Sequence, residues 1–137
     1  MAVRRIVPNV AATDVEAARG FYGGLLGLDI VMDLGWIVTF AASGASAAPQ
    51  ISVAREGGSA TPVPDVSIEV DDFDALVRRV EAGGHAVAYG PVREPWGVRR
   101  LYLRDPFGRL VNVLEHADRD GDGSADPIDG RPQAKSD

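Results

Sequence analysis

The sequence predicts an α+β fold in which two β-α-β-β-β modules form a cupped mixed sheet around a shared cavity. The first observation is that one order of strand-like and helix-like segments occurs twice along the chain. The second is that 57 residues separate the helix starts Asp14 and Asp71, and the same number separates the helix-ending glycines Gly27 and Gly84. Matching landmarks at one offset indicate an internal repeat, and two such copies would share one concave space.

Composition limits the classes of protein that remain. A length of 137 residues, 45% of them hydrophobic and 25% charged, fits one soluble domain that we number 1–116, followed by a tail at 117–137. Cysteine is absent, which excludes disulfides, cysteine nucleophiles and zinc–thiolate sites. The longest apolar run, Trp36–Ala42, is too short to span a bilayer, and the N-terminus lacks a signal peptide. We therefore expect a cytoplasmic protein without a membrane partner, and the net charge of −6 argues against nucleic acid.

The first module covers about residues 4–57. It opens with a β-branched strand at Ile6–Val10, and Thr13 with Glu16 three residues later is typical of a capping box. The helix that follows should end at Gly27. Its apolar face at helical spacing comprises Val15, Ala18, Phe21, Tyr22, Leu25 and Leu26. Three strands are predicted next, at Leu28–Met32, Trp36–Ala42 and Gln50–Arg55.

The second module covers about residues 63–116. Val66–Val70 alternates as a strand should, and Asp71 or Asp72 can cap a helix that ends at Gly83 and Gly84. The apolar face of this helix comprises Phe73, Leu76, Val77 and Val80. Three strands are again predicted, at Ala86–Tyr89, Val98–Arg104 and Leu110–Glu115.

The alternation of side chains predicts which of them face the cavity. Leu101 and Leu103 share the face that should pack on the helix, so Arg100 and Tyr102 should point into the cavity. A buried guanidinium needs a partner, and Asp65 or Glu69 could supply it. In the last strand the same argument directs Leu110, Asn112 and Leu114 into the cavity.

Aromatic side chains complete the candidate site. Trp36 and Phe40 are the candidates from the first module, with packing in the core as the alternative, and Trp96 in a Pro-Trp-Gly loop should rim the opening. Aromatic faces with one arginine and one amide suit a planar ligand with polar edges. The candidate ligand-binding residues are Trp36, Phe40, Asp65, Trp96, Arg100, Tyr102, Leu110 and Asn112. No motif for a nucleophile, a phosphate or a dinucleotide is present, so no catalytic residue is assigned.

Two motifs connect the chain to a known family. Phe21-Tyr22-x-x-Leu25-Leu26-Gly27-Leu28 and Asp105-Pro106-Phe107-Gly108 resemble motifs of the vicinal oxygen chelate superfamily. That superfamily includes glyoxalase I, bleomycin resistance proteins, fosfomycin resistance enzymes and extradiol dioxygenases, and the resemblance covers about residues 4–116.

The resemblance implies four positions at which metal-using members place ligands. Here these positions are Val7, Ser52, Asp65 and Asn112. Only Asp65 is a competent anionic ligand, so no cavity metal and no cofactor is expected. The two histidines, His85 and His116, fall elsewhere and are expected in loops or on the solvent side.

The resemblance therefore implies a metal-independent small-molecule-binding protein of the bleomycin-resistance type, which sequesters a toxic or antibiotic compound. One alternative is a divalent-metal lyase, isomerase or dioxygenase of the same superfamily. Another is an interaction protein whose cavity is vestigial. Because members of the family often dimerise, we expect a homodimer.

The tail carries a separate motif. Its oxygen-bearing side chains follow the spacing of a calcium loop, and the alternative is an acidic tail that only aids solubility. The residues of this candidate calcium site are Asp118, Asp120, Asp122, Ser124, Asp126 and Asp129.

Overall fold

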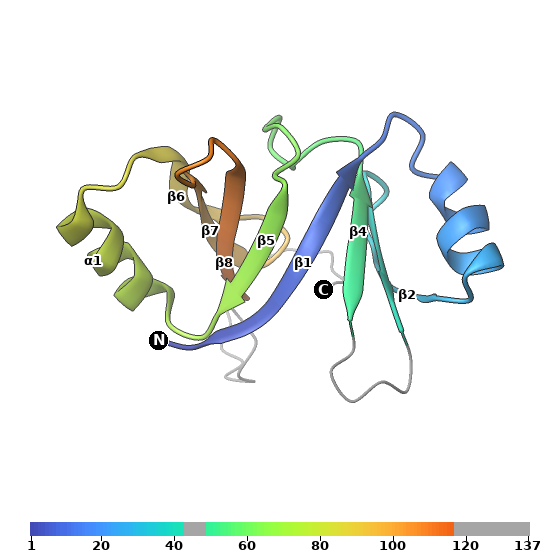
Figure 1. Ribbon diagram of the computed structural model, residues 1–137, viewed down its shortest axis with the longest axis horizontal. Helices are drawn as coiled ribbons and strands as arrows, with labels where there is room; N and C mark the ends of the chain where they lie inside the picture. Colours follow the sequence, from blue (N-terminus) through green and yellow to red (C-terminus); the bar gives the residue numbers. More distant parts are fainter. Residues whose placement is uncertain (43–48, 117–137) are drawn as a thin grey trace. The chain divides into compact units, whose positions relative to one another are not determined.

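The computed structural model describes residues 1–42 and 49–116, and its element order matches the predicted repeat (Figure 1). One strand, a helix and three further strands occur twice, so the α+β class and the two β-α-β-β-β modules are confirmed. The shared cavity between the modules stays a prediction. The residues of the candidate calcium site lie outside the described part of the chain.

The chain separates into two compact units. The N-terminal unit is Val7–Val63, and the C-terminal unit combines Met1–Ile6 with the residues from Pro64 onward. Strand β1 (Val3–Ala11) contributes residues to both units, because the unit boundary falls between Ile6 and Val7.

In the N-terminal unit the strand order is β2-β3-β4-β1. Strands β2 (Asp29–Asp33), β3 (Ile37–Ala41) and β4 (Gln50–Ala54) are antiparallel neighbours, and β4 runs parallel to β1. One face of this sheet packs against the helical segment. Its buried core comprises Val15, Ala18, Val38, Phe40 and Val53.

The first helix differs from the prediction. A turn at residues 15–16 leads into a π-helix, η1 (Arg19–Leu25), whose wider winding is seen in the bond from Leu26 N to Phe21 O. Residues spaced for an α-helix do not stay on one face of a π-helix. Consequently Val15 and Ala18 are buried as expected, whereas Phe21, Leu25 and Leu26 are exposed.

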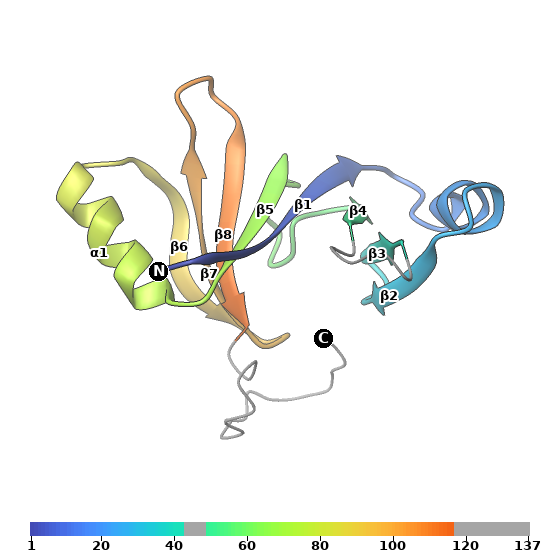
Figure 2. The same ribbon diagram turned by 60° about the horizontal axis from the view of Figure 1, so that its bottom comes forward.

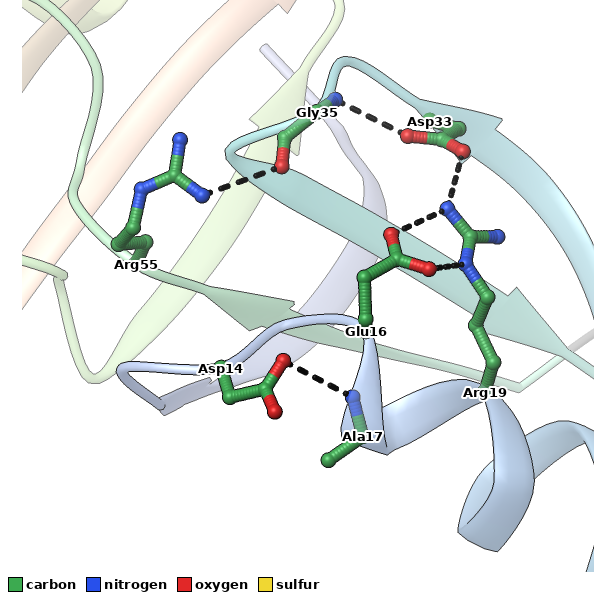
Figure 3. Close-up of polar contacts among 7 residues, drawn as sticks. All are labelled: Asp14, Glu16, Ala17, Arg19, Asp33, Gly35 and Arg55. Carbon is green, nitrogen blue, oxygen red and sulfur yellow. Dashed lines mark hydrogen bonds and ion pairs between the residues drawn. The ribbon is translucent and has the colours of Figure 1, made fainter.

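Side-chain ion pairs tie this helical segment to the end of β2 (Figure 3). Arg19 binds Glu16 through Nε at 2.7 Å and Asp33 through Nη2 at 2.6 Å. The Glu16 carboxylate is bonded to Arg19, and Asp14 Oδ1 accepts a hydrogen bond from Ala17 N at 3.3 Å. The predicted capping box of Thr13 and Glu16 is therefore wrong. The hydrogen bonds from Arg19 and from Gly35 N lower the pKa of Asp33 below its ordinary value of 3.8.

In the C-terminal unit the strand order is β1-β5-β8-β7-β6. Strand β5 (Val66–Val70) is parallel to β8 (Leu110–His116), and β7 (Val98–Arg104) is antiparallel to both β8 and β6 (Val87–Glu94). Helix α1 (Phe73–Gly83) lies along one face of these strands (Figure 2). The core beneath it contains Val70, Phe73, Leu101 and Val113, with Leu76 and Val77 packed against it.

Helix α1 begins and ends where the sequence predicts. Asp72 is the N-cap and accepts from Ala75 N at 3.0 Å, while Asp71 instead accepts from Ala2 N at 2.7 Å. Gly84 ends the helix with a positive φ of 67°, a conformation that glycine adopts without a steric cost. No helix among the described residues is both long and apolar enough to cross a membrane.

Candidate functional site

The candidate site lies on the helix-free face of the C-terminal unit, which we define as the side of strands β5–β8 opposite α1. Leu101 and Leu103 of β7 pack with the α1 core, as predicted, together with Val111 and Val113 of β8. Side chains alternate along a strand, so their neighbours lie on the opposite face. These neighbours are Arg100, Tyr102, Leu110, Asn112 and Leu114, and the predicted register is confirmed.

Arg100 forms a buried ion pair with Glu94. Its Nε lies 2.8 Å from Glu94 Oε2, and both side chains are at least 96% buried. Nη1 of Arg100 donates to the Tyr102 hydroxyl at 3.0 Å, and the Tyr89 hydroxyl donates to the same Glu94 oxygen at 2.8 Å. This partner, Glu94, is neither of the two that the sequence predicts, Asp65 and Glu69. Sequence reasoning missed Glu94 because it ended the preceding strand at Tyr89, whereas β6 continues to Glu94.

Three aromatic rings surround the same guanidinium. Its central carbon lies 4.9 Å from the ring centres of Trp96 and Tyr102, and 5.3 Å from that of Tyr89. Trp96 sits in the turn between β6 and β7, and it is only partly buried. A cation over an aromatic face is attracted by the ring quadrupole. Arg100 thus orders an aromatic cluster, comprising Tyr89, Trp96 and Tyr102, around a neutralised charge.

Asn112 carries a buried polar atom without a partner. Its Nδ2 donates to Ser67 Oγ at 3.0 Å, in keeping with the pairing of Ser67 and Asn112 in the β5–β8 register. Its Oδ1 accepts no hydrogen bond from any described residue, although the residue is only 7% exposed. Leaving a buried acceptor unsatisfied costs about 1–3 kcal/mol, so this atom favours a ligand that donates an N–H or O–H.

Asp65 holds the backbone together at the start of the last strand. Its Oδ2 accepts from Leu110 N at 2.9 Å, and the residue is exposed. Arg100 pairs with Leu114 in the β7–β8 register, four residues along β8 from Leu110. That separation is roughly 13 Å, so the expectation that Asp65 lies beside Arg100 is wrong.

The two aromatic candidates of the N-terminal unit are placed differently. Phe40 is fully buried in the core with Val38 and Val53, so the prediction that it faces the cavity is wrong and the core alternative holds. Trp36 precedes β3 and is partly buried, and its carbonyl oxygen accepts from Arg55 N at 2.8 Å.

The positions implied as metal ligands offer a poor donor set. In the N-terminal unit, Val7 is a buried aliphatic residue and Ser52 Oγ is bonded to Thr39 Oγ1 at 2.6 Å. In the C-terminal unit, the Asp65 carboxylate caps a backbone N–H and Asn112 is neutral. Across residues 1–42 and 49–116, no three acidic or histidine side chains gather as a metal site would. The residues present do not fit a divalent metal.

A residue that the sequence analysis set aside lies on the helix-free face. His116 is the last residue of β8, and its Nδ1 is 2.9 Å from Oε2 of Glu69, whose side chain is 1% exposed. The expectation of a loop or solvent-side position is wrong for His116, whereas His85 is exposed as expected. The signal was present in the alternation, because His116 shares the parity of Asn112 and Leu114, and Glu69 that of Ser67.

Solved structures of other proteins resemble this chain in fold. No curated protein matches the chain in sequence. Among solved structures, a glyoxalase/bleomycin resistance protein/dioxygenase superfamily member from Vibrio splendidus is 17% identical with a TM-score of 0.60, covering 84% of this chain and 99% of that one. A methylmalonyl-CoA epimerase from Streptomyces coelicolor is 19% identical with a TM-score of 0.64, covering 85% and 99%. That from Mycobacterium tuberculosis is 20% identical with a TM-score of 0.58, covering 87% and 90%.

These identities establish a common fold and no more. The sequence profile of the Glyoxalase/Bleomycin resistance protein/Dioxygenase superfamily matches residues 5–113, which is most of the chain and includes both repeated modules. The chain therefore belongs to the Glyoxalase/Bleomycin resistance protein/Dioxygenase superfamily.

Proposed function

We propose that this protein is a metal-independent small-molecule-binding protein of the bleomycin-resistance type, which sequesters a toxic or antibiotic compound. The observation that carries the proposal is the buried, unpartnered Oδ1 of Asn112 on the helix-free face. A ligand that donates a hydrogen bond there would remove a penalty of about 1–3 kcal/mol that the free protein bears.

The aromatic cluster supports a planar ligand. Trp96 and Tyr89 are only partly buried, and a flat molecule could contact the surface that these residues retain. Because Arg100 is already paired with Glu94, the ligand need not carry a negative charge. Aromatic contact with a few fixed polar groups is the usual composition of a small-molecule site.

The donor set supports independence from metal. A divalent metal requires several carboxylate or imidazole ligands, whereas the four family positions hold a valine, a serine, an aspartate and an asparagine. The single aspartate among them, Asp65, already accepts a hydrogen bond from Leu110 N.

Elemental analysis of the purified full chain after dialysis tests this proposal directly. We expect no stoichiometric nickel, zinc, manganese or iron. A stoichiometric metal that is lost in Asp65→Ala, and retained in the control Asp105→Ala, would refute the proposal and indicate a metal-dependent lyase, isomerase or dioxygenase. The control carboxylate lies in the turn between β7 and β8, where it accepts from Phe107 N and Arg109 N.

A further inference from the structure

His116 and Glu69 form a histidine–carboxylate pair that the proposed ligand contacts do not use. Oε2 of Glu69 bonds His116 Nδ1 at 2.9 Å, and Oε1 of the same carboxylate accepts from Arg5 Nε at 2.8 Å. Glu69 is 1% exposed, so its carboxylate is held on both oxygens inside the protein. Such a carboxylate can move very little.

The pair fixes which imidazole nitrogen is available. An ionised carboxylate only accepts hydrogen bonds, so the imidazole must carry a proton on Nδ1. When the ring is neutral, Nε2 then bears a lone pair. Within the described residues Nε2 has no hydrogen-bond partner. Nε2 is not one of the buried unpartnered atoms, so it reaches the surface, and the His116 side chain is 17% exposed.

The position of His116 places this lone pair on the face that we assign to the ligand. His116, Leu114 and Asn112 alternate along β8 and therefore share the helix-free face. Val98 is the register partner of His116, and Trp96 lies two residues before Val98 in the turn between β6 and β7. A planar molecule beside Trp96 would thus lie on the same side of the sheet as Nε2.

We propose that His116 is the general base of a proton-transfer site, with Glu69 as its positioning residue. The ligand class is a planar molecule bearing a weakly acidic O–H or N–H group. The proton passes from that group to Nε2, which leaves the ligand as an anion and the ring as an imidazolium whose charge the Glu69 carboxylate balances. The ligand class rests on the proposed binding function, whereas the state of His116 can be measured without any ligand.

Nitrogen NMR of the full chain labelled with ¹⁵N-histidine tests the first requirement. The chain has two histidines, so the spectrum contains only His116 and the exposed control His85. We expect the neutral ring of His116 to be protonated on Nδ1 and bare on Nε2. Protonation of Nε2 instead would overturn the proposal, because that nitrogen could not then accept a proton.

Acylation by diethyl pyrocarbonate tests the second requirement, an accessible and activated Nε2. The bare nitrogen attacks the reagent's carbonyl carbon, ethyl carbonate leaves, and the Nδ1 proton is released. We expect acylation of His116 in the folded wild type and a roughly tenfold lower rate in Glu69→Gln. A tenfold change in rate corresponds to about 1.4 kcal/mol.

The matched control is Glu115→Gln, which removes a carboxylate that bonds Arg99 and Phe73 N instead of a histidine. It should leave the acylation rate unchanged. A His116 that resists the reagent in the folded wild type, or that reacts equally fast in Glu69→Gln, is a purely structural residue and refutes the proposal. If Glu69→Gln does not fold, the acylation rate of Glu69→Asp and the nitrogen spectrum of the wild type decide whether the proposal holds. Neither measurement depends on the proposed ligand, so failure here is separate from failure of the binding function.

Discussion

Arg100 is the residue whose environment most changes its expected role. The sequence places it on the helix-free face, and the structure confirms that face while pairing it with Glu94 and three aromatic rings. A ligand anchor would have a guanidinium free to meet an incoming group. Here the guanidinium neutralises a buried carboxylate, so Arg100 contributes mainly to stability.

Replacing Arg100 by alanine should therefore destabilise the protein strongly. Removal of one partner from a buried ion pair leaves an uncompensated charge, at a cost of about 3–5 kcal/mol. Urea unfolding at neutral pH measures this loss as a lower transition midpoint. The control is Arg99→Ala on the opposite face, where the partly exposed ion pairs with Asp74 and Glu115 predict a loss of about 0–1 kcal/mol for each pair. Equal losses in both variants would mean that the pair with Glu94 does not hold the fold.

Residue-level prediction worked where the two faces of a strand differ in polarity. In β7 the leucines mark the helix side and Arg100 with Tyr102 mark the other, so the register was predictable. In β3 the two faces differ little in polarity, because Thr39 is the only polar residue of the strand and is itself buried opposite the side of Phe40. The partner of Arg100 was not predictable for another reason, because Glu94 lies beyond the residues at which the strand pattern was judged to end.

At the scale of elements, the helical segment of the N-terminal unit depends on its charges. Arg19 joins Glu16 to Asp33, and Asp33 also accepts from Gly35 N at 2.9 Å (Figure 3). Hydrogen bonds from Arg19 also lower the pKa of Glu16. These contacts attach a π-helix that has no buried residue to strand β2.

Asp33 should make the stability of this segment depend on pH. Since its folded-state pKa lies below the ordinary value of 3.8, the group stabilises the fold above that value. This contribution is lost as the pH falls through the lowered pKa. Asp33→Asn should therefore unfold more easily at neutral pH, and should lose less further stability between about pH 4 and about pH 2.

Urea unfolding of Asp33→Asn and of the control Asp29→Asn across this pH range checks the prediction. Asp29 lies on the same strand, and its substitution removes a carboxylate that forms no ion pair among the described residues. Parallel acid curves for Asp33→Asn and the wild type would contradict a role for Asp33.

The elements themselves were largely predictable, with the first helix as the exception. Capping residues and helix-ending glycines located α1 within a residue or two. The segment around η1 has apolar residues at α-helical spacing, yet it also contains Gly20, Gly23 and Gly24, which weaken the preference for an α-helix. Sequence periodicity does not report such a change in winding.

At the scale of the whole molecule, exposed apolar side chains of the N-terminal unit suggest self-association. Phe21, Leu25 and Leu26 follow one another on or next to η1, and Val31 on β2 is also exposed. Their exposed fractions lie between 52% and 70%, and exposed apolar side chains that gather in one patch favour association. We predict a homodimer.

Sedimentation analysis at micromolar concentration measures the mass directly. The wild type should sediment as a dimer, and Leu25→Glu should shift it towards the monomer without loss of thermal stability. The control Val87→Glu changes an exposed residue of β6 in the other unit and should leave the mass unchanged. A monomeric wild type would contradict the prediction.

The repeat predicted the fold because the order of strand and helix patterns and the spacing of the helix-ending glycines agree between the two modules. The candidate site was predictable only in part, because sequence patterns specify faces and not contacts. Asn112, Tyr102 and Arg100 were found from alternation, while Glu94 and the Glu69–His116 pair required the register of β5, β6 and β8. Side chains that meet across strands are set by that register, which the sequence does not display.

Thermal unfolding of the full chain with a set of planar antibiotics and aromatic metabolites, in the presence of a chelator, tests the central claim most directly. A ligand at one hundred times its dissociation constant adds ~2.7 kcal/mol to the stability of the native state. We predict that at least one compound raises the unfolding temperature of the wild type and of Arg99→Gln, but not of Asn112→Leu, whose unpartnered oxygen has been removed. A shift that is seen without the chelator and is lost when it is added would contradict independence from metal. A shift that persists unchanged in Asn112→Leu would contradict binding at the helix-free face.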